Sequence, residues 1–303
     1  MPNDKPHPEE EFGAELDQDL DIDEHLSERQ KERTQKLLEN PEALCNMVRR
    51  AAEGAGEIIM KYYEGLVDME VDTKNDDSPV TLADREAEGF IQMSLEMLTA
   101  DIPIIGEEAV ALNKAPKLGD SEYFWLVDPL DGTKEFIGGS DEFTVNIALI
   151  KNGVPVLGVV YAPAKGEMYS GFEGGKATRW MQDSGTEKEI SVRPSPKQGL
   201  TVVASKNHGD ASKLDKFLEQ FKVEKLTKRG SSLKICAVAA GKADIYPRFG
   251  LTCEWDTAAA DAVLRAAGGV ITDLDGNRLQ YGGADPKWLN PEFVACSFEW
   301  FEK

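Results

Sequence analysis

The segment WLVDPLDGTKEFI, residues 125–137, constrains the fold of this chain more than any other stretch. It begins as an apolar run typical of a buried strand and then delivers Asp128, Asp131 and Thr133 within six residues. A proline and a glycine between them favour a turn. Carboxylates packed this closely repel one another unless they are protonated or bridged by a cation, and a hard divalent ion is the usual bridge. The sequence therefore predicts a buried strand that ends in an oxygen-rich metal loop.

The same loop has features that suit an anion. If a helix begins near Thr133, the free amide groups of Gly132 and Thr133 face an anion at its N-terminus. Metal ions on one side and amides on the other make a place for a phosphate. Taken alone, however, DPLDGT also fits an Asp-rich turn or a helix cap without a ligand.

Two distant segments supply further carboxylates. IIGEE ends an apolar strand at Glu107 and Glu108, and EWDTAAADAVLRAAGG opens a helix at Asp256. Each signal is weak alone, because an Asp at a helix start is more often an N-cap than a metal ligand.

Helices are expected before a sheet. From Asn40, the stretch NPEALCNMVRRAAEGAGEIIMKYYEG has a cap residue, Pro41 at the first helical position and apolar residues at spacings of three and four. A second helix follows Thr81, through ADREAEGFIQMSLEML. The runs PIIGEE, YFWLVD, FTVNIALI, VPVLGVVYAP and GEMYSGF then predict strands, and Asn152 with Gly153 between two of them predicts a β-hairpin.

A boundary is expected near residue 198, after the strand-like ISVRP, where Pro194, Pro196 and Gly199 cluster. Beyond it, LTVVAS, SSLKICAVAAG, ADIYPRF, DTAAADAVLRAAG and GVITDLDG alternate strand and helix. The prediction is an extension over 1–40, an α+β half with the metal loop over 41–198, and an α/β half over 199–303.

Charge and composition exclude several classes of protein. The chain has 303 residues, 41% of them hydrophobic, and a formal charge of −21, which argues against binding nucleic acid polymers. Residues 1–25 hold ten acidic side chains against one lysine, so we expect disorder in the extension. With no signal peptide, no apolar run of about 18 residues and no disulfide framework, we expect reduced cysteines, no integral membrane segment and a cytoplasmic protein.

The order and spacing of GEE, DPLDGT about twenty residues later and WDTAA about 125 residues after that is specific. From about residue 41 to the C-terminus, the chain resembles the lithium-sensitive, magnesium-dependent phosphatase family that includes inositol monophosphatase. The resemblance implies an αβαβα five-layer sandwich and two or three bound Mg²⁺ ions. Ala260 departs from the family's usual WDTAAG, and the extension lies outside the resemblance.

The resemblance also implies roles for individual residues. The metal ligands are Glu107, Asp128, the carbonyl of Leu130, Asp131 and Asp256. Asp84, in PVTLAD, pairs with Thr133 to position or deprotonate the attacking water, and Glu107 completes this catalytic group. Metal-assisted hydrolysis of this kind needs no serine or cysteine nucleophile.

Other segments narrow the substrate. DEFTVNIALIKNGVPVLGVVYAP, GSSLKICAVAAGKADIYPRFG and LNPEF closely resemble CysQ-type 3′(2′),5′-bisphosphate nucleotidases within this family. The likeness implies removal of the 3′-phosphate of adenosine 3′,5′-bisphosphate to give AMP, with 3′-phosphoadenylyl sulfate as a second substrate. The implied substrate contacts are Glu107, Leu130, Asp131, Gly132, Thr133, His208, Ser231, Lys234, Arg248 and Asp256.

Alternatives stay open at this point. The second phosphate of such a substrate needs local positive charge, which Lys234 and Arg248 can supply, but either could be a solvated side chain. One rival is an inositol monophosphatase-like enzyme of broad sugar-phosphate specificity. Another is a catalytically silent metal- or nucleotide-binding regulator that uses the acidic extension as its interaction arm. A monomer or homodimer is expected, and peripheral contact with the inner membrane is left open.

Overall fold

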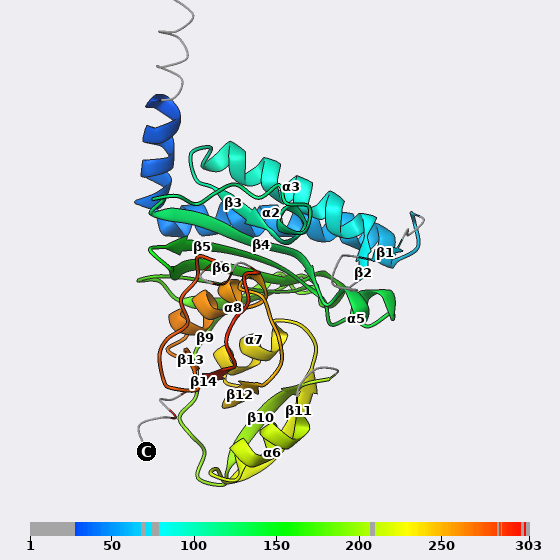
Figure 1. Ribbon diagram of the computed structural model, residues 1–303, viewed down its shortest axis with the longest axis vertical. Helices are drawn as coiled ribbons and strands as arrows, with labels where there is room; N and C mark the ends of the chain where they lie inside the picture. The colour runs from blue at the N-terminus through cyan, green and yellow to red at the C-terminus, as the bar shows by residue number, and fades with distance from the viewer. Residues whose placement is uncertain are drawn as a thin grey trace, which may run out of the picture.

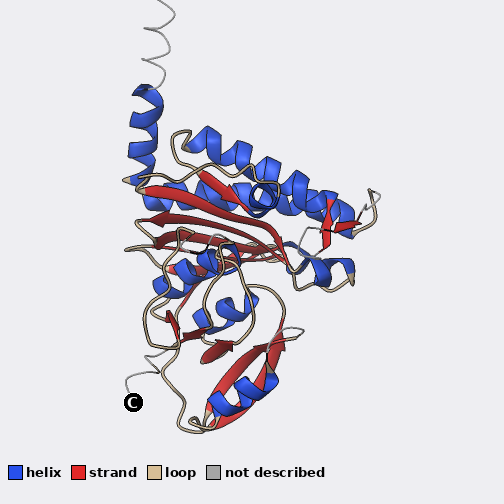
Figure 2. Ribbon diagram, viewed as in Figure 1, coloured by secondary structure: helices blue, strands red, loops and turns tan. Residues whose placement is uncertain are grey.

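The computed structural model describes residues 28–67, 71–73, 79–206, 210–283, 285, 287–297 and 300, and the statements below refer to them. Helices and sheets alternate in five layers (Figures 1 and 2), which confirms the αβαβα fold expected from the sequence. The described part contains no helix with the length and apolar character needed to cross a membrane.

The first layer consists of two long helices, α2 (Pro41–Tyr63) and α3 (Leu82–Leu98). As predicted, the Asn40 side chain caps α2, accepting a hydrogen bond of 3.2 Å from the amide of Ala43. A small antiparallel ribbon of β1 (Val71–Thr73) and β2 (Pro79–Thr81) leads into α3.

The second layer is a seven-stranded sheet in the order β3-β4-β5-β6-β7-β8-β9. Only its β3–β4 pair is parallel. The predicted hairpin joins β5 to β6, with positive φ at Asn152 (49°) and Gly153 (79°). The strands are β3 (Ile104–Gly106), β4 (Tyr123–Asp131), β5 (Thr144–Lys151), β6 (Val154–Ala162), β7 (Glu167–Phe172), β8 (Ala177–Met181) and β9 (Thr186–Ile190). Short helices interrupt the connections: α4 (Glu107–Ala111), α5 (Thr133–Ile137) and the 3₁₀ turn η1 (Pro163–Lys165).

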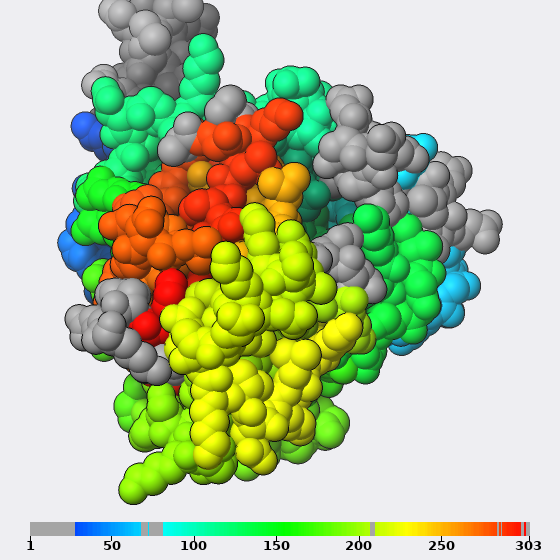
Figure 3. Space-filling view, turned by 60° about the horizontal axis from the view of Figure 1, so that its bottom comes forward, coloured from blue at the N-terminus to red at the C-terminus, as the bar shows by residue number. Residues whose placement is uncertain are grey.

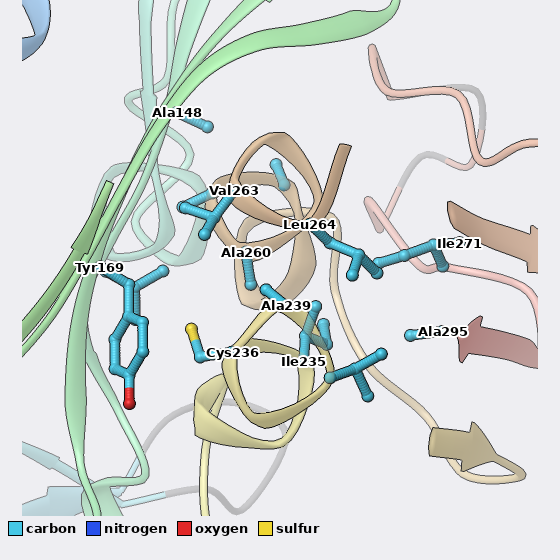
Figure 4. Packing of buried hydrophobic residues seen from close by; sticks show 14 of the residues in the cluster. Ala148, Tyr169, Ile235, Cys236, Ala239, Ala260, Val263, Leu264, Ile271 and Ala295 are labelled. Carbon is cyan, nitrogen blue, oxygen red and sulfur yellow. The ribbon is translucent and has the colours of Figure 1, made fainter. Parts of the chain in front are cut away.

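The third layer, α7 (Leu233–Ala239) and α8 (Trp255–Ala266), lies between the two sheets (Figure 4). Helix α8 approaches the first sheet so closely that a Cβ on Gly158 would lie 2.1 Å from the carbonyl oxygen of Ala259. Ala260, where the family commonly has glycine, is fully buried in this core. The layer therefore packs both sheets around one hydrophobic core.

The fourth layer is a five-stranded sheet in the order β11-β10-β12-β14-β13. Its strands are β10 (Leu200–Ser205), β11 (Val223–Arg229), β12 (Ile245–Arg248), β13 (Val270–Asp273) and β14 (Phe293–Cys296), and α6 (Ala211–Leu218) forms the fifth layer. In the space-filling view, α6 and β11 occupy the centre of the visible face (Figure 3). Residues 191–199 connect the two sheets, and the division into domains near residue 198 stays a prediction.

The extension differs from the prediction of disorder through residue 40. Residues 28–38 form a helix, because Thr34 is buried and donates a hydrogen bond to Asp101, while Leu37 and Leu38 pack against the core. The acidic stretch over 1–27 lies outside the described residues. All four cysteines lie in the described part and are free thiols, and three of them are buried.

Candidate active site

A cavity of about 270 Å³ opens where β4 and α5 of the first sheet meet α7, α8 and β12. The predicted site residues that line it are Glu107, Asp131, Gly132, Thr133, Ser231, Lys234, Arg248 and Asp256. These side chains are separated by up to 149 positions in the chain, and the layers bring them to one place.

Three carboxylates form the centre of the site. Asp128 and Asp131 lie at the end of β4, Asp256 lies in the first turn of α8, and one oxygen of each falls within 4.8 Å of the others. A break in the β4–β5 register between Asp128 and Asp131 lets both carboxylates contribute. Burial, together with the neighbouring carboxylates, raises the pKa of Asp131 and Asp256, although Lys234 opposes the rise at Asp131. This donor set suits a hard divalent cation, which would relieve the repulsion.

The loop that follows β4 has a fixed conformation. Asp128 accepts a hydrogen bond of 3.0 Å from the amide of Leu130, and Gly132 adopts φ 93°, which a residue with a side chain rarely adopts. A Cβ on Gly132 would also lie 3.2 Å from the carbonyl oxygen of Glu142. The glycine of DGT is therefore needed for the turn that starts α5 at Thr133.

Glu107 is the first residue of α4 and lines the same cavity, and its charge contributes to the raised pKa of Asp131 and Asp256. Helix α4 is held from α3 by Glu88, which the sequence analysis missed. The carboxylate of Glu88 accepts hydrogen bonds of 2.8 Å from the amides of Glu108 and Ala109. Glu88 therefore fixes the turn that carries Glu107.

Asp84 and Thr133 meet, although 49 positions separate them. Asp84 is buried at the start of α3 and accepts bonds from the amide of Thr81 (2.8 Å) and its hydroxyl (2.6 Å). The Thr133 hydroxyl lies 3.2 Å from both Asp84 Oδ1 and the carbonyl oxygen of Leu130. Because the hydroxyl hydrogen points to these acceptors, the Thr133 oxygen can accept a hydrogen bond from a water in the cavity.

Lys234 lies on α7 and lines the same cavity. Its ammonium donates a hydrogen bond of 2.5 Å to the carbonyl oxygen of Ser231 and lies 5.6 Å from the centre of the Tyr246 ring. Burial lowers the pKa of Lys234 to about 8, and the charge of Asp131 opposes this shift. Ser231 adopts a left-handed φ of 45° at the cavity wall.

Arg248 lines the cavity from the end of β12, and its guanidinium also holds the loop after that strand. It donates to the carbonyl oxygens of Gly250 (3.2 Å) and Leu251 (2.8 Å). Leu251 is 77% exposed and lines the cavity. His208 lies outside the described residues, so its predicted contact stays a prediction.

Three further residues, Thr144, Asn146 and Ser232, are buried beside the cluster and were not predicted from the sequence. A signal for two of them exists, since Thr144 and Asn146 are polar residues two positions apart within the apolar run FTVNIALI. That spacing places both on one face of a strand.

Residues 40–300 match the family model described as the inositol monophosphatase family. The chain belongs to the inositol monophosphatase family. Among its relatives, the 3′(2′),5′-bisphosphate nucleotidase CysQ of Escherichia coli K12 is 46% identical over 250 residues, covering 82% of this chain and 98% of the relative. The enzyme of the same name from Buchnera aphidicola is 41% identical over 256 residues, covering 84% and 94%.

Solved structures of this family agree with the fold. The crystal structure of CysQ from Bacteroides thetaiotaomicron aligns with a TM-score of 0.71 at 36% identity, covering 84% of this chain and 98% of that one. An inositol monophosphatase from Zymomonas mobilis aligns with a TM-score of 0.67 at 26% identity, covering 84% and 93%. The predicted family and fold are thus confirmed, while the roles of individual residues stay predictions.

Proposed function

We propose that this member of the inositol monophosphatase family is a Mg²⁺-dependent 3′(2′),5′-bisphosphate nucleotidase. It removes the 3′-phosphate of adenosine 3′,5′-bisphosphate and releases AMP and inorganic phosphate, with 3′-phosphoadenylyl sulfate as a second substrate. The observation that carries the proposal is one cavity that brings together a carboxylate cluster and the cations of Lys234 and Arg248, in a chain 46% identical to a CysQ nucleotidase.

Asp128, Asp131 and Asp256, with Glu107 and the carbonyl of Leu130, would hold two or three Mg²⁺ ions. Bound Mg²⁺ supplies charge neutralisation of the phosphate oxygens and a lower pKa for coordinated water. The clustered carboxylates with raised pKa support this assignment, because they gain stability from a cation.

Asp84 and Thr133 would handle the proton of the attacking water. Thr133 orients the water by accepting its hydrogen bond, and it can pass its own hydroxyl proton to Asp84 Oδ1, 3.2 Å away. The bonds from Thr81 to the other carboxylate oxygen of Asp84 hold that acceptor in place. This arrangement supports general-base assistance by Asp84 through Thr133.

The second phosphate of the nucleotide needs a local positive charge in a protein whose formal charge is −21. Lys234 and Arg248 supply it from adjacent positions on the cavity wall, where both are buried and little screened by water. A small sugar monophosphate has no second phosphate, and so gains less from these two cations. The pair therefore favours a bisphosphate.

The nucleobase would lie against the apolar part of the cavity. Ile235, Tyr246 and Phe293 contribute buried apolar surface there, and Leu251 projects from the loop that Arg248 holds. A ligand that covers Leu251 removes apolar surface from water, which favours binding.

The proposal is tested by measuring Mg²⁺-dependent phosphate release from adenosine 3′,5′-bisphosphate, inositol 1-phosphate and fructose 1,6-bisphosphate. We expect the nucleotide to have the highest kcat/KM of the three. A higher value for inositol 1-phosphate would favour the broad sugar-phosphate specificity instead, and no release from any of them would favour a silent regulator.

A further inference from the structure

A buried polar cluster joins β5 to the segment that precedes α7. The hydroxyl of Ser232 lies 2.8 Å from the hydroxyl of Thr144 and donates a hydrogen bond of 2.7 Å to the side-chain oxygen of Asn146. Thr144, Asn146 and Ser232 are at most 3% exposed. Buried hydroxyl groups are costly unless paired, and both hydroxyls of this cluster are paired, as is the side-chain oxygen of Asn146; its Nδ2 has no partner among the described residues.

This cluster lies directly behind the carboxylates. In the β4–β5 register, Asp128 is opposite Asn146 and Asp131 is opposite Thr144. The amide of Ser232 donates a hydrogen bond of 2.6 Å to Asp131 Oδ2. Ser232 therefore binds the strand pair twice: its side chain contacts β5, and its main chain contacts a carboxylate at the end of β4.

The same residue sets the position of the segment that carries Lys234. Ser231, directly before it, has φ 45° and accepts the hydrogen bond from the Lys234 ammonium. The Ser231 hydroxyl is buried at the cavity and has no partner among the described residues, which leaves it available to a ligand. A shift of Ser232 would therefore move Ser231 and Lys234 together.

We propose that Ser232 is a positioning residue that couples the metal-binding carboxylates to the substrate-binding segment over residues 231–234. Its hydroxyl, held by Thr144 and Asn146, fixes the amide that orients Asp131 and the turn that presents Lys234. This inference rests on the proposed function for the identity of the ligands. Ser232 acts by positioning Asp131 and Lys234.

The test compares Ser232→Ala with Ser170→Ala. Ser170 is a matched control, because it is also buried and its hydroxyl lies 3.0 Å from that of Thr178, in the β7–β8 pair. Each variant loses one buried hydroxyl–hydroxyl pair, and Ser232→Ala also loses the hydrogen bond to the side-chain oxygen of Asn146. We expect both to lower the melting temperature in the absence of metal.

Only Ser232→Ala is expected to weaken Mg²⁺ binding, by about tenfold in titration calorimetry, because loss of a group that orients a metal ligand has effects of this size. It should also raise KM for adenosine 3′,5′-bisphosphate. If both variants lower the melting temperature and neither changes Mg²⁺ affinity or KM by more than about twofold, Ser232 is only structural and the inference is wrong.

Thr144→Val provides a second route if Ser232→Ala does not fold. It keeps the shape of the side chain and removes the hydroxyl that contacts Ser232. Its effect on Mg²⁺ affinity should match the direction seen with Ser232→Ala, and the double variant should lose less than the sum of the two, as expected for residues in contact. Additive effects would contradict a shared network.

Failure of this inference can be distinguished from failure of the proposed function. The calorimetric titration uses Mg²⁺ alone and needs no substrate. If the unmodified protein does not hydrolyse the nucleotide but does hydrolyse inositol 1-phosphate, the proposed substrate is wrong, and the Mg²⁺ titrations still decide the role of Ser232.

Discussion

Two groups of residues at the cavity, which we call the carboxylate wall and the substrate wall, carry opposite charges and are built in different ways. The carboxylate wall, from β4 and the first turn of α8, presents Asp128, Asp131 and Asp256, and burial raises the pKa of Asp131 and Asp256. The wall from α7 and β12 presents Lys234 and Arg248, both buried and both bonded to main-chain carbonyls. We infer that the carboxylate wall determines the chemistry and that the substrate wall determines which phosphate ester is chosen.

The largest expected effect comes from the carboxylate wall. Asp128→Asn should abolish phosphate release from the nucleotide, inositol 1-phosphate and fructose 1,6-bisphosphate alike, because the neutral amide cannot supply the charge that the cations need. The rise in melting temperature on addition of Mg²⁺ should shrink at the same time. Activity retained on any of the three esters would contradict the inference that the carboxylates are required for hydrolysis of every substrate.

The second largest effect should come from removal of the Thr133 hydroxyl. Thr133→Val should lower kcat by about 10² to 10⁴, the range for a group that assists proton transfer. Thr133→Ser keeps the hydroxyl and serves as the control. Calorimetric Mg²⁺ affinity should change little, and a large loss of affinity instead would assign Thr133 to metal binding rather than to the water.

On the substrate wall, Lys234→Met removes the charge and keeps a side chain of similar length. KM for adenosine 3′,5′-bisphosphate should rise by about ten- to hundredfold, the worth of a hydrogen bond to a charged group. KM for inositol 1-phosphate should change by less than about threefold, which corresponds to a difference of about 0.7 kcal/mol in binding free energy. Equal losses on both substrates would mean that Lys234 acts through Asp131 and not through the second phosphate.

Mg²⁺ binding should depend on pH with a definite sign. Burial raises the pKa of Asp131 to about 6 and that of Asp256 to about 8, above their unfolded values. The metal-free fold therefore loses stability as the pH rises from the unfolded pKa values to these raised values. Over the same range, a cation that displaces the protons binds more tightly as the pH rises, by up to about tenfold per pH unit for each proton. Melting temperatures with and without Mg²⁺ should differ more at pH 8 than at pH 6. A difference that is larger at pH 6 would contradict the assignment of these carboxylates.

The smallest effect should come from the apolar edge of the substrate wall. Leu251→Ser should raise KM for the nucleotide by about threefold, because only part of the leucine surface is covered by a base. Inositol 1-phosphate should be unaffected. Leu274→Ser, at an exposed turn, is the control, and an equal change in both variants would exclude a contact between Leu251 and the base.

The carboxylate wall was largely predictable from the sequence, because Asp128, Asp131 and Thr133 are close in the chain and follow an apolar strand. The substrate wall was less predictable from the sequence. Arg248 was expected to face the ligand, and the structure adds that it holds its own loop. Ser232 escaped prediction because its partners on β5 are 86 and 88 positions away, and no local pattern reports such a contact.

In the fold, too, the elements with local sequence signals were predicted, and several strands without such signals were not. Helix α2 and the β5–β6 hairpin follow from caps and turn residues. Strand β8 and edge strands β9 and β11 were missed, and β9 ends at Ile190, where ISVRP was expected to begin a strand. Edge strands β9 and β11 are rich in exposed charged residues and lack the alternation that marks a half-buried strand, and such charges are common at sheet edges.

The most direct measurement is a competition in one tube, with equal concentrations of adenosine 3′,5′-bisphosphate and inositol 1-phosphate, Mg²⁺ and the full chain, followed by ³¹P NMR. The ratio of the two rates gives the ratio of kcat/KM. The 3′-phosphate resonance of the nucleotide should disappear first while the 5′-phosphate resonance remains as that of AMP. Consumption of inositol 1-phosphate ahead of the nucleotide, or loss of the 5′-phosphate, would contradict the proposed function.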